Sequence, residues 1–138
     1  MSTNIADHAI AEGIIESIED GELMLKVPGT DYRLRLHVGD DDTLDAGVGD
    51  RVRGVVNAEA LRIHPASGGG RFVEPTIGAP RIVAGTVLEA DAAQRRIVIR
   101  TAVPMTLKTM PEQDFSVIRE GELVNCHVRS GATFALVS

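Results

Sequence analysis

The sequence repeats itself weakly at a spacing of 72 residues, and this repeat constrains the fold more than any other feature of the chain. Apolar residues and glycines match across the two copies, as in Gly13 with Gly85, Ile15 with Val87, Leu25 with Ile97, Val27 with Ile99, Gly49 with Gly121, Val52 with Val124, Val56 with Val128 and Ala60 with Ala132. Because these positions stay in phase from one end of each copy to the other, we interpret the chain as an internal duplication.

Within each copy, apolar and polar residues alternate, which is typical of strands with one buried face. Turn residues such as Pro28–Gly29 separate the alternating runs, and Ser130–Gly131 predicts a last hairpin. The pattern predicts five strands in each unit, at residues 10–18, 22–28, 31–38, 50–57 and 59–64 in the first, and at 82–90, 95–101, 103–108, 121–128 and 132–137 in the second.

The chain thus divides into a first unit at 1–64, a Gly- and Pro-rich linker at 65–80, and a second unit at 81–138. A unit of about 70 residues buries only about 60% of the surface of its unfolded chain and is marginally stable alone. We therefore expect the two units to pack together or to self-associate.

Short motifs in both copies carry a resemblance to known small barrels. They are Gly13-Ile14-Ile15 and Gly85-Thr86-Val87 at the start of each copy, and Gly49-Asp50-Arg51-Val52 with Ala58-Glu59-Ala60-Leu61 at the end of the first. With a longer connection after each third strand, the chain resembles the OB-fold and the related TOBE and Mop modules, which often occur in tandem. The resemblance implies an all-β chain of two tandem five-stranded OB-like Greek-key barrels.

The chain departs from the Mop pattern where that pattern binds its ligand. Mop modules that bind molybdate carry Ser-Ala-Arg-Asn before the opening glycine. Here residues 5–8 are Ile-Ala-Asp-His and residues 79–82 are Ala-Pro-Arg-Ile. Oxyanion binding as in Mop-like modules therefore remains one alternative among several, because a fold does not determine a function.

Charge and aromatic content weigh against nucleic-acid binding, since the net charge is −6 and the chain has one Tyr, three Phe and no Trp. Arginines of the first unit nevertheless form a candidate anion or nucleic-acid face, made of Arg33, Arg35, Arg51, Arg53 and Arg62. The alternative interpretation is that these arginines pair with nearby acidic side chains across the strands.

Other candidate sites favour structural roles. In the linker, Arg71, Phe72 and Val73 are expected to contact the other barrel or a partner. Cys126 lies on the inward phase of its strand and is expected to be an inert, buried thiol. The acidic run 40–42 with Asp45 is interpreted as a solvated loop. The sequence predicts no catalytic residues, cofactor or metal site.

These features favour a non-enzymatic binding or scaffold module that acts through protein contact or self-assembly. Nucleic-acid binding through the arginine face and small-oxyanion binding are the alternatives. The single cysteine and the absence of a long apolar stretch predict a cytoplasmic location without membrane contact.

Overall fold

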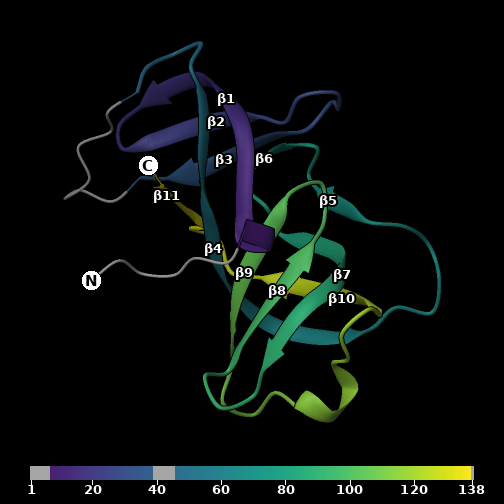
Figure 1. Cartoon of the computed structure of the whole chain (residues 1–138). Coiled ribbons are helices and arrows are strands. Elements are labelled where there is room, and N and C mark those ends of the chain that lie inside the picture. The colour runs from purple at the N-terminus through teal and green to yellow at the C-terminus, as the bar shows by residue number, and fades with distance from the viewer. Residues whose placement is uncertain (1–6, 39–45, 138) are drawn as a thin grey trace.

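The computed structural model describes residues 7–38 and 46–137, and strands dominate this part of the chain (Figure 1). Its strands are β1 (Ile10–Glu19), β2 (Glu22–Lys26), β3 (Arg33–His37), β4 (Arg51–Pro65), β5 (Phe72–Glu74), β6 (Ile77–Gly78), β7 (Ile82–Asp91), β8 (Arg96–Arg100), β9 (Pro104–Thr109), β10 (Leu123–Val128) and β11 (Thr133–Leu136). Two short 3-10 helices accompany them, η1 (Asp7–Ala9) and η2 (Phe115–Val117). The all-β prediction is confirmed.

The first three strands form an antiparallel meander whose inward residues build part of the core. Ile15 of β1 lies opposite Leu25 of β2, and Leu25 lies opposite Leu34 of β3. All three side chains are fully buried, and each burial stabilises the fold by roughly 1.5–3 kcal/mol. A bulge between Ile15 and Ser17 bends β1, so that one half of the strand pairs with β4 and the other half with β2.

Strands β7, β8 and β9 have the same arrangement. Val87 lies opposite Ile99, and Ile99 lies opposite Met105. A bulge between Val87 and Glu89 bends β7, so that one half pairs with β10 and the other half with β8. The inward residues of the two meanders therefore correspond strand by strand.

The two meanders differ in their first turn. Asp20–Gly21 joins β1 to β2, and positive φ angles of 51° and 77° give it the geometry of a tight hairpin turn. Residues 92–95 join β7 to β8, a connection two residues longer. Leu25 consequently corresponds to Ile99, and the predicted alignment of Leu25 with Ile97 is wrong by two residues.

A glycine at the corresponding place in each unit forms a hydrogen bond with the first strand of the meander. Gly49 has a φ of 94° and donates its N–H to the carbonyl of Ile15 at 2.7 Å. Gly121 has a φ of 87° and donates to the carbonyl of Val87 at 2.8 Å. Left-handed backbone of this kind favours glycine, which explains why glycine stands at this position after both meanders.

The fifth strands are exchanged between the two halves of the chain. β4 is one strand of 15 residues: its start pairs with β1 and β11, and its end pairs with β10 and β9. The segment 59–64, predicted as a separate strand of the first unit, is thus the end of β4 and lies beside β10. The segment 132–137 contains β11, which pairs with β4 and β3 rather than forming a hairpin with β10.

We therefore name the units by their pairing. The first unit is β1, β2, β3, β11 and residues 51–57 of β4, and the second unit is β7, β8, β9, β10 and residues 58–65 of β4. The predicted boundaries 1–64 and 81–138 follow the chain, whereas the strand pairing crosses them in both directions. The buried apolar side chains of both units form a single cluster.

The connecting segment 65–80 also joins the sheet, through β5 beside β7 and β6 beside β3. Val73 is 1% exposed, and its N–H donates to the Tyr32 hydroxyl at 3.3 Å. Phe72 is half-buried and Arg71 is exposed. None of the helical segments in the described residues has the length and hydropathy of a membrane-spanning helix.

Candidate functional site

The predicted arginine face is only partly assembled. Arg51 of β4, Ile14 of β1, Lys26 of β2 and Arg33 of β3 lie opposite one another in succession, which places them in one row across four strands. Arg33 and Arg51 thus share a row, although β1 and β2 separate their strands. Arg33 donates from Nε to Glu16 at 2.8 Å.

The other members of the face lie outside this row. Arg35 lies opposite Met24, and Arg53 lies opposite Glu12. Arg62 lies opposite His127 in the second unit, apart from the other four arginines. Ligand binding by the arginine face therefore stays a prediction.

The cysteine lies where the alternation predicts it. Cys126 of β10 is 0% exposed, and this burial raises the pKa of its thiol to about 12. A thiol held neutral in this way is a poor nucleophile, because the thiolate is the reactive form. The prediction that Cys126 is buried is confirmed, and the inertness of its thiol stays a prediction.

The histidines and acids do not gather into a metal centre in the part of the chain that the structure describes, where no group of three or more His, Cys, Asp or Glu side chains is placed to hold a metal ion. His8 contacts Glu89 at 3.0 Å, and Glu89 also contacts Arg96; His37 contacts Glu22 at 3.3 Å. The acidic run 40–42 with Asp45 lies outside the described residues.

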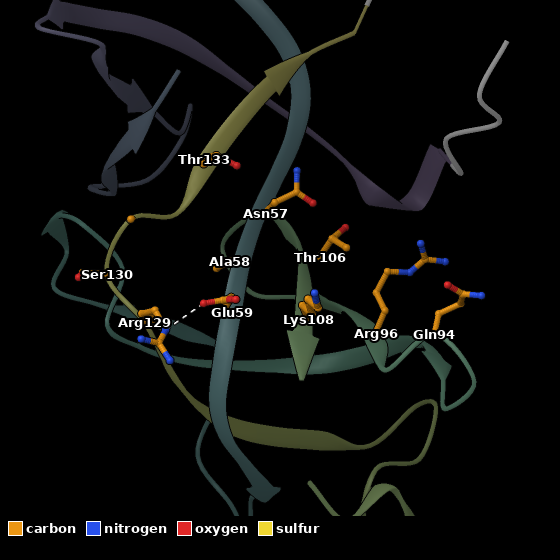
Figure 2. A pocket seen from close by; sticks show the side chains of 11 residues that line it. Asn57, Ala58, Glu59, Gln94, Arg96, Thr106, Lys108, Arg129, Ser130 and Thr133 are labelled. Atoms are coloured by element: carbon orange, nitrogen blue, oxygen red, sulfur yellow. Dashed lines mark ion pairs between the residues drawn. The ribbon is translucent and has the colours of Figure 1, made fainter. Parts of the chain in front are cut away.

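A pocket of about 410 Å³ lies where β4 passes from the first unit to the second and where the chain runs from β10 to β11 (Figure 2). Its walls include residues 57–59 of β4 and residues 129–131 between β10 and β11. These two segments are 72 residues apart, so positions that the 72-residue spacing matches lie in one pocket. The second unit supplies the remaining lining from β8, β9 and the turn before β8, namely Gln94, Arg96, Thr106 and Lys108, and β11 adds Thr133. We call this hollow the central pocket.

The side chains of the central pocket are those that bind anions. Arg96, Lys108 and Arg129 supply three positive charges against the single carboxylate of Glu59. Hydroxyls and an amide complete the polar lining, from Thr106, Ser130, Thr133 and Asn57. Figure 2 shows Arg96 and Gln94 on one side, Arg129 and Ser130 on the other, and Lys108 with Glu59 between them. This local excess of positive charge contrasts with the net charge of −6 of the whole chain.

Two of the three cations lie directly opposite each other. Arg96 of β8 and Lys108 of β9 form a cross-strand pair. Like charges in such a pair destabilise a sheet, because their side chains point from the same face within a few ångströms. Arg96 has partial compensation from Glu89 at 3.5 Å and Asp91 at 3.9 Å. Lys108 takes part in no ion pair among the described residues, and it is exposed.

The third cation is tied to the carboxylate. Arg129 Nε lies 2.9 Å from Glu59 Oε1, and the Arg129 N–H donates to the Glu59 carbonyl at 2.8 Å. Glu59 in turn lies beside Lys108 in the parallel pairing of β4 and β9. The pocket therefore has a carboxylate held by Arg129 and, beside it, an ammonium that forms no ion pair among the described residues.

Sequence reasoning did not single out the central pocket. Its residues are scattered polar positions of several strands and turns, and Ser130–Gly131 predicts an ordinary turn. One signal is present in the sequence: the 72-residue spacing matches Asn57 with Arg129, and both residues are polar. Without knowledge of the strand exchange, nothing indicated that these segments meet.

A second hollow, of about 370 Å³, lies between the end of β4 and the loop that carries η2. Gln113 binds both the N–H and the carbonyl of Ile63, at 2.9 and 3.0 Å, which fastens the loop to the strand. Hydrogen bonds from the hydroxyl and N–H of Ser116 hold the pKa of Asp114 below its usual value. These contacts give the loop a structural role.

Fold and pocket together define the class: an all-β protein with a cation-lined pocket between two units of similar strand arrangement. A crystal structure of the cytoplasmic molybdate-binding protein ModG, with molybdate bound, is similar in fold, with a TM-score of 0.54 and 18% identity over 98% of this chain and 100% of that chain. At this identity the similarity shows the fold alone. No family model matches the sequence, and no curated protein is significantly similar to it. The predicted resemblance to Mop and TOBE modules is supported at the level of the fold.

Proposed function

We propose that this protein is a non-enzymatic binder of small oxyanions, which it holds in the central pocket. The observation that carries the proposal is the cross-strand pair of Arg96 and Lys108. An anion between the two side chains would offset their mutual repulsion and form charge-assisted hydrogen bonds with both. The molybdate-binding neighbour in fold supports the same ligand class.

The first unit supplies an internal contrast. The cross-strand pair at the corresponding place is Glu22 with His37, whose side chains approach to 3.3 Å. There the cross-strand neighbours make a direct side-chain contact. In the second unit both positions carry cations; Glu89 and Asp91 pair with Arg96, whereas Lys108 forms no ion pair among the described residues, so a ligand would supply its compensating charge.

The proposal includes the origin of the fold. Two OB-like barrels arose by duplication of one five-stranded unit, and each gave its last strand to the other. The matched bulges at Ile15 and Val87 and the matched glycines Gly49 and Gly121 support a common origin.

A cytoplasmic location belongs to the same proposal and rests on the single, buried Cys126. Contact with a protein partner through Arg71 and Phe72, or self-association, remains a separate expectation for light scattering to test.

Calorimetry with molybdate, tungstate, sulfate and phosphate at low ionic strength tests the proposed function. We expect at least one of these anions to bind, and we expect Lys108→Ala to weaken the affinity roughly tenfold, because a hydrogen bond to a charged group contributes about 1.5–3 kcal/mol before solvent screening. The chain contains one other lysine, Lys26, which lies outside the pocket. Lys26→Ala is therefore the matched control and should bind as the wild type does. Absence of binding by all four anions would contradict the proposal.

A further inference from the structure

The carboxylate of Glu59 is an unusual component of an anion site. It is the only acidic side chain in the lining of the central pocket, where it accompanies Arg96, Lys108 and Arg129. A carboxylate repels a neighbouring anion, so its presence weakens the binding of any ligand that offers it no proton. Its position therefore bears on which oxyanions the pocket accepts.

Glu59 is held in place by two contacts with one residue. The Arg129 side chain occupies Oε1 at 2.9 Å, and the Arg129 main chain binds the Glu59 carbonyl at 2.8 Å. An ionised carboxylate has two oxygens and about four acceptor positions, so the ion pair leaves Oε2 able to accept another hydrogen bond.

Oxyanions differ in what they offer to such an acceptor. Hydrogen phosphate and hydrogen arsenate keep a hydroxyl at neutral pH, whereas sulfate and molybdate present only unprotonated oxygens. A P–OH group donates a hydrogen bond to Oε2, while a bare oxygen in the same place repels it. A ligand that leaves an acceptor of the site without a hydrogen bond loses binding free energy. This loss lets a polar site discriminate between ligands of similar size and shape.

We propose that Glu59 makes the central pocket selective for tetrahedral oxyanions that carry a proton at neutral pH, with hydrogen phosphate preferred over sulfate and molybdate; this inference rests on the proposed oxyanion-binding function. Lys108 and Arg96 bind the unprotonated oxygens, and Glu59 accepts the hydrogen bond from the hydroxyl. The site is then selective in two ways: its cations attract every oxyanion, and the Glu59 carboxylate repels those that carry no proton. The fold neighbour binds molybdate, so the preference of this chain would differ from that of its neighbour.

Calorimetry at neutral pH and constant ionic strength tests the inference, with phosphate, arsenate, sulfate and molybdate as the probes. In the wild type we expect phosphate and arsenate to bind at least roughly tenfold more tightly than sulfate and molybdate, the ratio that about 1.4 kcal/mol produces. Glu59→Gln removes the charge and keeps the size, and it should bring the phosphate-to-sulfate ratio close to one, mainly by strengthening sulfate binding. Glu120→Gln is the control, because Glu120 is an exposed acid outside the pocket, and it should keep the wild-type ratio.

The outcomes separate this inference from the function on which it rests. If none of the four anions binds, the proposed function is wrong and the inference is wrong with it. If sulfate or molybdate binds to the wild type as tightly as phosphate does, the function stands and the selectivity is refuted. The same holds if Glu59→Gln binds anions and leaves the ratio unchanged. The wild-type order of affinities decides the matter even if a variant folds poorly.

Discussion

The two units of this protein share a backbone and differ in the charges on it. Both have a bulged first strand, a buried row across three strands and a positive-φ glycine that binds back to the first strand. They differ where the second strand of each meander begins and the third ends: Glu22 lies opposite His37 in the first unit, and Arg96 lies opposite Lys108 in the second. The comparison teaches that the positions under steric constraint carry the same residue types in both units, whereas the exposed positions carry different charges.

The strand exchange makes the strongest prediction, because it places the end of the chain in the first unit. Phe134 of β11 is 1% exposed and its ring packs against Gly54 of β4. Phe134→Ala should lower the free energy of unfolding by about 3–5 kcal/mol, the usual cost of removing a large buried side chain. Hydrogen exchange should show the largest loss of protection in β1, β2 and β3. Loss confined to β7–β10 would mean that β11 belongs to the second unit and that the exchange does not occur.

The shared backbone predicts equal sensitivity at Gly13 and Gly85. A Cβ on Gly85 would lie 2.7 Å from the Arg100 carbonyl oxygen, and a Cβ on Gly13 would lie 2.8 Å from the Lys26 carbonyl oxygen. Each Gly→Ala substitution should cost about 1–3 kcal/mol, because neither backbone group can move away cheaply.

Urea unfolding measures both effects. Gly68→Ala is the control, since a Cβ there meets no atom within 4 Å, and it should leave the midpoint almost unchanged. If only one of the two glycines proved sensitive, the correspondence between the units would be superficial.

The difference in charge predicts a smaller effect of opposite sign. Lys108→Gln removes the like charge opposite Arg96 without placing an acid beside Glu59, and it should raise the free energy of unfolding by about 0.2–1 kcal/mol in a buffer free of oxyanions while it weakens anion binding. His37→Gln is the matched change in the first unit; it relieves no like-charge pair and should change stability little. Thermal unfolding in a zwitterionic buffer makes the measurement. Destabilisation by Lys108→Gln would show that Lys108 is already compensated within the protein.

Part of the fold could be predicted from local pattern. The alternation at Leu34 and Leu36 predicts a strand with one buried face, and both side chains are fully buried. The same alternation predicts the burial of Cys126. These predictions succeed because the direction of a side chain in a strand depends on its immediate neighbours along the chain.

The partners of the strands could not be predicted in this way. β4 is one continuous strand whose two halves pair with different units. No local feature at Asn57 or Ala58 marks the point where it passes from one unit to the other. The central pocket depends on this passage, because it brings residues 57–59 beside residues 129–131. The turn at 92–95 likewise shifted the second strand by two residues without disturbing its alternation. Long-range pairing and loop length therefore account for what the sequence pattern missed.

Chemical footprinting of the two lysines tests the central claim, oxyanion binding in the central pocket, most directly. Lys26 and Lys108 are the only lysines of the chain, so limited acetylation followed by mass spectrometry reports each one separately, with and without saturating phosphate or molybdate. The account predicts that a bound anion slows the acetylation of Lys108 severalfold and leaves the rate at Lys26 unchanged. Equal rates at Lys108 with and without every anion, or protection of Lys26 alone, would contradict it.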